Sequence, residues 1–407
     1  MREMKDSGHE TIGLVPSDWT EKRLKYLCKI QTGNEDTQNA NPEGKYPFYV
    51  RSPIVEHCDR YTFDGEGILV AGDGAGAGRI FHHVYGKYAV HQRVYRLSHF
   101  AGNADFIYYY LSNLFPHEMD KGSAQSTVPS MRLPMLLNFP LFLPSKKEQD
   151  KIVTFLDSKC SEIDAITADI QKEIETLEQY KRSVITEAVT KGLNPDVEMK
   201  DSGIEWVGNV PDHWGVLANK YVMKKRKDIC TKWNGENVLS LTMNGVIVRD
   251  LDNPVGKMPT TFDGYQFVYS GNLLMCLFDY DVTPRCVGIV KNAGVTSPAY
   301  SRFELKENAT LEYFYYYYLM IDFTKELLHL AKNLRHSFTE EQLGALKVPL
   351  PPLDEQKNIA TYLDSKCKEI ESVIASKKQQ LEVLDSYKKS LIYEYVTGKK
   401  EVPMYES

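Results

Sequence analysis

The sequence EQDKIVTFLDSKCSEID at residues 148–164 returns 207 positions later as EQKNIATYLDSKCKEIE at residues 355–371. A second pair of matching stretches comes earlier in each half. Residues 4–19 read MKDSGHETIGLVPSDW and residues 199–214 read MKDSGIEWVGNVPDHW, at an offset of 195. Self-similarity at a fixed offset is the sequence signature of repeated structure. The chain therefore has two copies of one plan, in which long variable blocks alternate with short, nearly identical ones.

Each short block predicts one long helix. Hydrophobic residues recur every seven positions with Glu, Lys and Asp between them, which is the pattern of a coiled-coil helix. We expect Ile152, Ile166, Ile174, Tyr180 and Ile185 to widen the first stripe, and Lys377 breaks the second. Each helix of roughly 40 residues would be about 60 Å long. We expect an antiparallel pair; two separate helices, each docked on its own domain, are the alternative. The expected core residues are Leu156, Ile163, Ile170, Leu177, Val184, Leu363, Ile370, Leu384 and Leu391.

The variable blocks are related to each other more faintly. At an offset of 206 the recurring pairs are Gly65/Gly271, Asp73/Asp279, Arg79/Arg285 and Arg96/Arg302. The drift in offset predicts a loop that changes length between Trp19 and Gly65. Each block combines short apolar stretches bounded by turns, typical of strands, with a Tyr-rich stretch typical of a core-facing helix.

The fold class is therefore α+β, with two mixed globular domains separated by two long helices and an internal pseudo-twofold repeat. We expect the globular domains at residues 1–143 and 199–350. The helical regions are expected at residues 144–198 and 351–407.

The composition is that of a folded protein in a reducing compartment. Of 407 residues, 42% are hydrophobic and 26% are charged, which is typical of globular proteins. The seven cysteines form no CxxC pair, which argues against a disulfide framework and a thiolate zinc site. No apolar run approaches the roughly 20 residues that span a bilayer, and the sequence starts without an apolar signal core. We therefore expect a cytoplasmic protein with no membrane partner.

Recognisable catalytic motifs are missing from the sequence. The stretch GDGAGAGR at residues 72–79 fits neither a dinucleotide fingerprint nor a P-loop, and its counterpart FDYDVTPR at 278–285 has no glycine. The tetrapeptides Asn-Pro-Pro-Tyr and Asp-Pro-Pro-Tyr of amino-methylating DNA methyltransferases do not occur. Asp157-x-Lys159 and Asp364-x-Lys366 match the end of a nuclease metal site, but they lie on the expected helices without a carboxylate cluster. We expect a binding protein with no catalytic residue, metal or cofactor of its own.

A net charge of −6 does not favour nucleic-acid binding, so a binding face would need locally clustered positive charge. The sequence offers a basic run, the recurrent arginines and a polar turn before each helical block. Such residues contact phosphates, and Arg and Gln also read guanine and adenine. For any one of them a solvated surface charge is the alternative, and for the recurrent arginines a structural ion pair. The candidates are Asp73, Arg79, Gln92, Arg93, Arg96, Gln125, Ser126, Thr127, Lys224, Lys225, Arg226, Lys227, Thr283, Arg285, Arg302, Lys332, Arg335, His336 and Ser337.

With these blocks and motifs the chain resembles the specificity (S) subunits of type I restriction-modification systems, the HsdS family. The resemblance covers nearly the whole length. It rests on KDSGIEWVG at residues 200–208 and LPPLDEQKNIATYLD at residues 350–364. The first copy departs from these motifs, with HETIG and PSKKEQ at the corresponding positions.

The resemblance implies a non-catalytic subunit that reads a bipartite, asymmetric sequence in double-stranded DNA, one half per recognition domain. It implies that the antiparallel helices space the domains and dock two methyltransferase (M) subunits, which bind S-adenosylmethionine and methylate adenine. Restriction (R) subunits, which use ATP and Mg, would join that core. Two alternatives come from other classes: a coiled-coil scaffold joining two protein-binding domains, and an unrecognised nuclease or methyltransferase.

Overall fold

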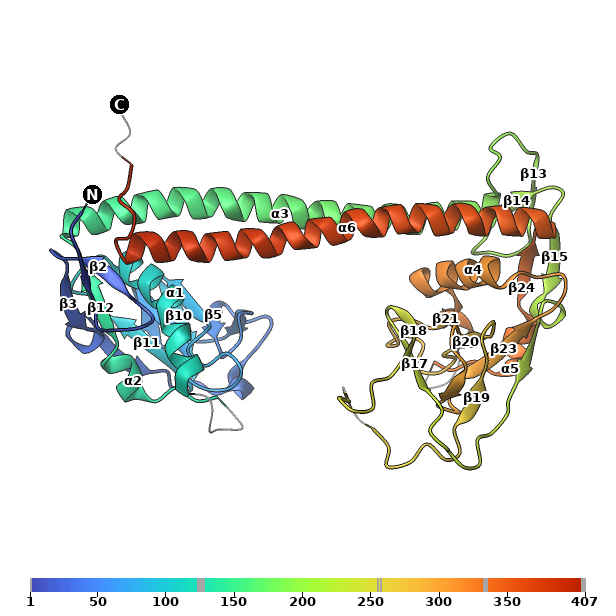
Figure 1. Ribbon diagram of the computed structural model, residues 1–407, viewed down its shortest axis with the longest axis horizontal. Helices are drawn as coiled ribbons and strands as arrows, with labels where there is room; N and C mark the ends of the chain where they lie inside the picture. Colours follow the sequence, from blue (N-terminus) through green and yellow to red (C-terminus); the bar gives the residue numbers. More distant parts are fainter. Residues whose placement is uncertain (1, 123–128, 255, 257, 332–335, 404–407) are drawn as a thin grey trace. The chain divides into compact units, whose positions relative to one another are not determined.

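The computed structural model contains two compact units. Unit 1 consists of residues 1–170 and 378–407, and unit 2 consists of residues 171–377. Two long helices, α3 (Lys146–Lys191) and α6 (Leu353–Val396), contribute to both units. Each unit therefore combines one variable block with one part of each long helix (Figure 1). The structure describes residues 2–122, 129–254, 256, 258–331 and 336–403.

Unit 1 contains two four-stranded sheets, with strand orders β4-β11-β8-β9 and β6-β5-β10-β7. Neighbouring strands are antiparallel except β5 and β10, which are parallel. Two short strand pairs, β1-β2 and β3-β12, complete the unit. The strands are β1 (Met4–Asp6), β2 (Leu14–Pro16), β3 (Thr20–Arg23), β4 (Lys29–Thr32), β5 (Tyr46–Tyr49), β6 (Glu56–Cys58), β7 (Phe63–Asp64), β8 (Gly67–Ala71), β9 (Phe81–Val84), β10 (Lys87–Val90), β11 (Val94–Ser98) and β12 (Pro140–Leu143).

Unit 2 repeats this topology strand for strand. Its sheets have the orders β16-β23-β20-β21 and β18-β17-β22-β19, and β17 and β22 form the parallel pair. The shared topology confirms that the variable blocks have one fold. The main change in loop length lies between β18 and β19, at residues 249–265, where unit 1 has only residues 59–62. The strands are β13 (Met199–Asp201), β14 (Asn209–Pro211), β15 (Gly215–Ala218), β16 (Met223–Arg226), β17 (Val238–Thr242), β18 (Gly245–Val248), β19 (Gln266–Val268), β20 (Leu273–Met275), β21 (Val287–Ile289), β22 (Gly294–Thr296), β23 (Ser301–Leu305) and β24 (Lys347–Leu350).

The Tyr-rich stretches form the helices α1 (Ala104–Gly122) and α4 (Leu311–Thr324). Each helix places aromatic side chains in the core of its unit, including Tyr110 in α1 and Tyr313 and Tyr317 in α4, which are all fully buried. The core-facing prediction is therefore confirmed at these positions. Helices within the described ranges that are long enough to cross a membrane are not apolar enough to do so. The short helices are η1 (Leu24–Tyr26), η2 (Thr37–Asn39), α2 (Leu133–Leu137), η4 (Asn219–Tyr221), η5 (Glu326–Leu330) and α5 (Glu340–Ala345).

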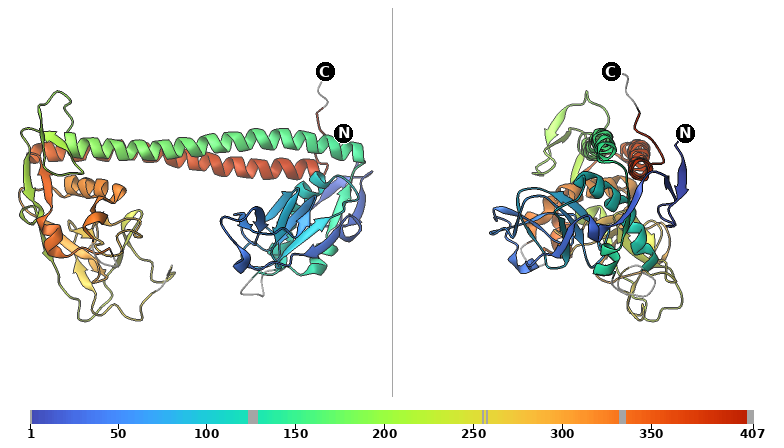
Figure 2. Two further views of the ribbon diagram at one scale, coloured as in Figure 1. Left: turned by 180° about the vertical axis from the view of Figure 1, so that it is seen from behind. Right: turned by 90° about the vertical axis from the view of Figure 1, so that its left-hand side faces the viewer.

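In each unit the parts of α3 and α6 lie side by side (Figures 1 and 2). In unit 2, Glu173 pairs with Lys377 and Lys181 pairs with Glu371, so residue numbers rise along one helix as they fall along the other. This confirms antiparallel pairing within the unit. Of the expected core residues, those that are buried are Leu156, Ile163, Val184, Leu363, Ile370 and Leu391, and those that are half-buried are Ile170, Leu177 and Leu384.

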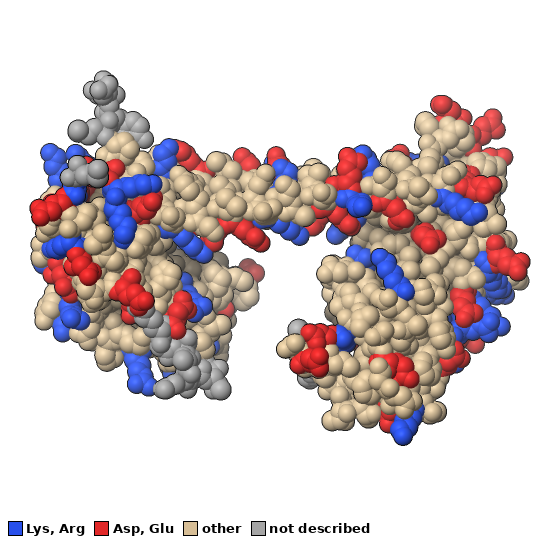
Figure 3. Space-filling model, viewed as in Figure 1, with Lys and Arg blue, Asp and Glu red and all other residues tan. Residues whose placement is uncertain are grey.

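Of the residues expected to widen the buried stripe, three are buried: Ile152, Ile174 and Ile185. The expectation is wrong for Ile166 and Tyr180, because each is 49% exposed. A seam between two helices covers mainly the a and d positions of the heptad, so a wider stripe leaves its margins in solvent. Lys and Arg alternate with Asp and Glu along the visible face of the helices (Figure 3).

The repeated motifs connect each unit to one helix start and one helix end. Gln149, near the start of α3, donates to the Pro144 carbonyl (2.9 Å) and accepts from the Asn103 amide at the start of α1 (3.1 Å). Gly398, just after α6, lies against Pro16 and Trp19 so closely that a Cβ there would be 2.5 Å from Pro16 Cγ. The Gly398 φ of +69° is also the left-handed conformation common at helix C-termini.

Unit 2 has the equivalent connections, but here they join the domain to the start of α6 and the end of α3. Gln356, at the start of α6, donates to the Pro351 carbonyl (2.9 Å) and accepts from the Thr310 amide before α4 (2.8 Å). Gly192, after α3, packs beside Trp214. The recurrence of these motifs within the chain therefore has a physical cause, which is the joining of helix ends to the domain.

Candidate nucleic-acid interface

Three strand ends meet at one edge of the unit 1 sheet β4-β11-β8-β9. Because neighbouring strands are antiparallel, β4 and β8 end where β11 begins. The residues beside these ends enclose a cavity of about 650 Å³, which we call the unit 1 hollow. Its lining is Thr32, Gly33, Asn34, Gly72, Asp73, Gln92, Arg93, Tyr95, Ser130 and Met131.

The polar groups of the unit 1 hollow are held by ion pairs and hydrogen bonds at its rim. Asp73 Oδ1 accepts from Arg51 Nη1 (3.0 Å), and Asp73 Oδ2 lies 3.7 Å from Arg93 Nε. Gln92 Nε2 donates to Asp36 Oδ2 (2.6 Å). The rim therefore presents guanidinium donors and amide groups in fixed places, which are the groups that read base edges and phosphates.

The structure brings Asp73, Gln92 and Arg93 together as a set, whereas Arg79 lies elsewhere. Arg79 is at the far end of the 72–79 loop, where its guanidinium pairs with Asp120 of α1. The polar turn at Gln125, Ser126 and Thr127 lies outside the described residues. The segment that follows it does reach the hollow, because the Met131 amide donates to the Gly72 carbonyl (2.8 Å).

Arg96 and Arg302 occupy equivalent positions on β11 and β23, and both are buried. Arg96 Nε donates to Tyr88 Oη on β10 (2.7 Å). Arg302 Nη1 donates to the Phe267 carbonyl on β19 (2.8 Å), and its Nη2 donates to Asp228 Oδ2 (2.9 Å). Each side chain therefore connects the two sheets of its unit. This geometry favours the structural alternative over DNA contact for both arginines.

The same edge of unit 2 carries different chemistry. Lys227 follows β16, Phe278 lies in the segment after β20, and Tyr300 precedes β23. The Phe278 and Tyr300 rings are stacked, with centroids 6.1 Å apart. Besides the recurring Asp73/Asp279 pair, unit 1 therefore presents amide and guanidinium groups, whereas unit 2 presents aromatic rings and a lysine.

The segment after β20, residues 277–286, is the counterpart of the 72–79 loop, and we call it the unit 2 loop. The polar turn before the second helical block lies against it. The Phe338 amide donates to the Leu277 carbonyl (2.8 Å), and His336 Nδ1 lies 3.0 Å from Asp281 Oδ2. In unit 1 the described residues that follow the turn, Ser130 and Met131, likewise lie beside the 72–79 loop.

The other candidates of this region lie within or beside the unit 2 loop. Thr283 and Arg285 are half-buried, and Arg285 Nη1 donates to Tyr315 Oη of α4 (3.3 Å). Ser337 is half-buried next to His336. Lys332 and Arg335 lie outside the described residues.

The basic run Lys224–Lys227 forms most of β16 and the residue after it. Two of its four charges have acidic neighbours: Lys225 Nζ is 3.6 Å from Glu340 Oε2, and Arg226 Nε is 2.8 Å from Glu304 Oε2. Lys and Arg side chains gather, with acidic ones beside them, at the edge that carries β15 and β24 (Figure 3). A cavity of about 360 Å³ there is lined by Asn219, Lys220, Met223, Lys224, Lys225, Phe303, Lys306, Glu340, Leu343 and Gly344.

Sequence reasoning missed Asn34, Arg51 and Ser130 at the unit 1 hollow. The available signal was the position of Asn34 in the sequence. Asn34 comes just after β4, and Gln92 and Arg93 come just before β11, which pairs with β4. The two Asp-x-Lys pairs have a structural explanation. Asp157 accepts from Tyr109 Oη and Asp364 accepts from Tyr316 Oη, each at 2.7 Å. Among the described residues, no group of three or more His, Cys, Asp or Glu side chains is arranged to hold a metal ion.

Comparison with known proteins identifies the family of this chain. Residues 16–176 and 282–383 match the type I restriction modification DNA specificity domain. The match covers both units and more than half of the chain, so this chain belongs to the family of type I restriction modification DNA specificity domains.

Curated relatives and a solved structure agree over almost the whole length. The chain is 20% identical to the specificity subunit of the type I restriction enzyme EcoDI from Escherichia coli, over 90% of this chain and 86% of that protein. It is 26% identical to the MjaVIII specificity subunit from Methanocaldococcus jannaschii, over 95% and 94%. A chain from a structural study of complex assembly in the type I R-M system has the same fold, with a TM-score of 0.65 at 14% identity, over 95% of this chain and 99% of that one.

Proposed function

We propose that this chain is the DNA sequence-specificity subunit of a type I restriction-modification complex in the prokaryotic cytosol, without catalytic residues of its own. Unit 1 and unit 2 would each read one half of a bipartite, asymmetric target in double-stranded DNA. One observation carries the proposal. The units share one strand order and the recurring Asp73/Asp279 pair, while other residues at the equivalent sheet edge differ, with Gln92 and Arg93 in one and Phe278 and Tyr300 in the other.

The surface of the long helices supports the binding of two copies of one partner. Ile166 and Val373 are equivalent positions at an offset of 207, as are Tyr180 and Tyr387, and all four are between 42% and 55% exposed. Ile166 and Tyr387 belong to unit 1, and Tyr180 and Val373 belong to unit 2. Exposed apolar groups repeated in this way suit two copies of one partner. We assign this surface to methyltransferase subunits, which would bind S-adenosylmethionine; restriction subunits that use ATP and Mg would join them.

The deciding experiment is co-purification of the chain with its cognate methyltransferase subunit, followed by genome-wide mapping of methylated adenines. We expect one bipartite motif that depends on this chain. A stable complex without any motif would favour the scaffold alternative. Methylation or cleavage by the purified chain alone would favour the enzyme alternative.

A variant at the unit 1 hollow connects that motif to the structure. Arg93→Ala removes a guanidinium from the rim without touching a core residue. We expect a loss of about 1–3 kcal/mol in binding and relaxed choice at one position of one half-site. Arg23→Ala is the control, since Arg23 is an exposed arginine of unit 1 that is absent from the hollow lining and whose bond to the Asn138 carbonyl is also exposed. Equal effects of the two variants would contradict the assignment of the hollow.

A further inference from the structure

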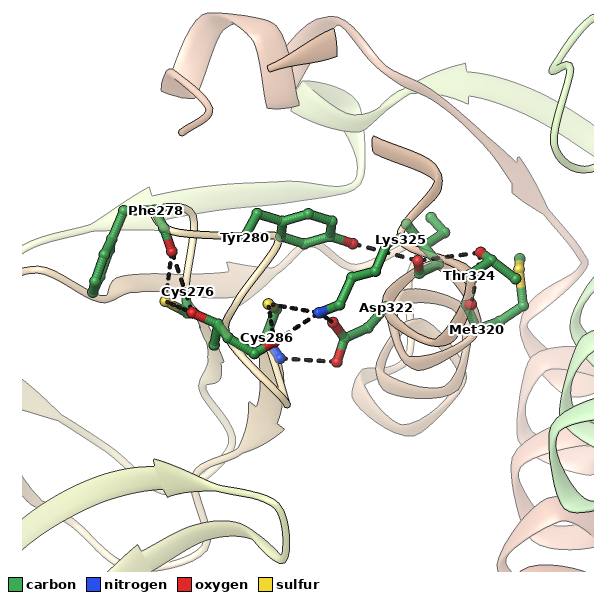
Figure 4. Close-up of polar contacts among 10 residues, drawn as sticks. Cys276, Phe278, Tyr280, Cys286, Met320, Asp322, Thr324 and Lys325 are labelled. Atoms are coloured by element: carbon green, nitrogen blue, oxygen red, sulfur yellow. Dashed lines mark hydrogen bonds and ion pairs between the residues drawn. The ribbon is translucent and has the colours of Figure 1, made fainter. Parts of the chain in front are cut away.

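The unit 2 loop is held at its C-terminal end by a buried carboxylate of α4 (Figure 4). Asp322 lies in the last turn of α4, and its side chain is only 3% exposed. Its Oδ2 accepts from the Cys286 backbone amide (2.8 Å), and its Oδ1 accepts from Lys325 Nζ (2.6 Å). A buried carboxylate is stable only when it is paired and hydrogen-bonded, so the loop backbone is one of the groups that satisfies this charge.

Lys325 continues the connection to the middle of the loop. Its Nζ donates to the Thr283 carbonyl (2.8 Å), lies 3.4 Å from Cys286 Sγ and lies 4.6 Å from the centroid of the Tyr280 ring. Lys325 is the first residue after α4 and has a φ of +52°, a conformation that non-glycine residues seldom adopt. The Tyr280 hydroxyl donates to the Ile321 carbonyl of the same helix turn (3.3 Å).

The equivalent junction in unit 1 has no such ion pair. Met119 occupies the position of Lys325 at the offset of 206, and it packs on Gly78 of the 72–79 loop. The packing is close, because a Cβ on Gly78 would lie 2.5 Å from Met119 Cγ. The 72–79 loop and the unit 2 loop therefore both dock on the domain helix. In unit 1 the contacts are apolar packing at Met119 and the exposed Arg79–Asp120 ion pair, and in unit 2 they are a buried charged network.

We propose that Asp322 and Lys325 are positioning residues that fix the unit 2 loop and thereby determine which bases unit 2 accepts. The inference rests on the proposed function. Lys325 acts through the Thr283 carbonyl, and Asp322 acts through the Cys286 amide, so neither needs to touch DNA. Charge-assisted hydrogen bonds are short and directional, and a binding site works only when its groups are held within about 0.5 Å of the required place.

These contacts would also suggest a reactive site, because the Lys325 amine lies beside the Cys286 thiol. Burial raises the pKa of the Cys286 thiol, and the same holds for Cys276, whose amide donates to the Cys286 carbonyl (2.8 Å). Both thiols therefore stay protonated at neutral pH and are poor nucleophiles. The cluster is better suited to holding the backbone than to a reaction.

The test uses the chain assembled with its methyltransferase subunits. The double variant Asp322→Asn/Lys325→Met keeps an acceptor for the Cys286 amide and leaves no unpaired buried charge, so the fold is preserved while the bond to the Thr283 carbonyl is lost. Methylation rates are measured on the cognate target and on targets with one base changed in either half. We expect discrimination to fall about tenfold in one half-site only, in line with the usual cost of a mismatch.

Two further variants separate positioning from general stability. Lys325→Arg keeps a cation that can reach the Thr283 carbonyl, and we expect this single variant to keep most of the discrimination of the unchanged chain. Glu312→Gln changes an exposed charge at the start of the same helix, and we expect discrimination like that of the unchanged chain. Equal loss in both half-sites, or no loss in either, would overturn the proposal.

Hydrogen exchange of the full chain without DNA gives a readout that does not depend on the proposed function. We expect the amides of the unit 2 loop to exchange at least about tenfold faster in the double variant, while those of the first turns of α4 keep their rates. Unchanged exchange in the loop would refute the positioning role. A wild-type complex that methylates no bipartite motif would instead refute the proposed function, and these two failures are read from different measurements.

Discussion

At the scale of single residues, the structure separates arginines and lysines that hold the fold from those that face solvent. Arg302 is 2% exposed and donates to a carbonyl of β19 in the other sheet of unit 2. Lys224, by contrast, lies on β16 and is exposed. A contact with a phosphate releases counterions and contributes about one unit to the salt dependence of DNA binding. A buried guanidinium contributes to stability instead.

We therefore expect opposite results from two substitutions. Arg302→Met should lower the free energy of unfolding by about 1–3 kcal/mol, because it leaves the Phe267 carbonyl without its donor, and should leave the slope of log K against log salt unchanged. Lys224→Ala should lower that slope by roughly one and leave stability unchanged. Urea unfolding and DNA binding by the assembled complex at several salt concentrations measure both quantities. A reduced slope for Arg302→Met would show that the arginine contacts DNA after all.

At the scale of elements, the joints between long helices and domains explain the short motifs. Gln356 is fully buried and bonds to the Pro351 and Asn308 carbonyls and the Thr310 amide. These groups come from the start of α6 and the segment before α4, so one side chain fixes the angle between two helices.

Gln356→Leu should therefore destabilise unit 2 strongly. The leucine fills a similar volume but leaves three polar groups without their partner, one buried and two partly buried. The cost is about 1–3 kcal/mol for the buried group and less for each of the others. The midpoint of urea unfolding measures the loss. Gln380→Leu, at an exposed position of the same helix, is the matched control. Equal midpoints for the two variants would mean that the motif has another purpose.

The exposed apolar positions of the helices lead to a separate prediction about assembly. Ile166→Glu in unit 1 and Val373→Glu in unit 2 should each weaken one of two equivalent docking surfaces, because a charge would be buried there without a partner. We expect one methyltransferase subunit per chain for either single variant and none for the double variant, measured by mass photometry. Full occupancy in the double variant would place the docking surface elsewhere.

Sequence patterns predicted the elements well and the site only in part, for physical reasons. Repeats and heptads report periodic burial, so both long helices and the shared fold followed from them. The error at Ile166 and Tyr180 arose because a heptad pattern does not say how wide the covered face is. Asp322 and Lys325 look like an ordinary pair three residues apart on a helix. Only the return of the unit 2 loop to that helix gives them a role, and such long-range contacts have no local signal.

At the scale of the whole molecule, unit 1 is built from two parts of the chain that are far apart in sequence, and unit 2 is the continuous stretch between them. The chain passes from unit 1 to unit 2 after Ile170 in α3 and returns after Lys377 in α6. Both positions lie within continuous helices. Lengthening the helices there would leave the heptad core and the ion pairs of each unit as they are, because those contacts are made within a unit.

We therefore expect matched insertions of seven residues after Ile170 and after Lys377 to be tolerated and to change the target. Seven residues keep the heptad phase to within about 20° and add about 10 Å of helix, which corresponds to roughly three base pairs at 3.4 Å each. Mapping of methylated adenines should show the same two half-sites with a longer spacer. The same insertion in α3 alone should shift one helix against the other, separate pairs such as Lys181–Glu371 and abolish assembly. If the matched insertions left the spacer unchanged, the helices would not set the spacing, and that role would pass to the partner subunits.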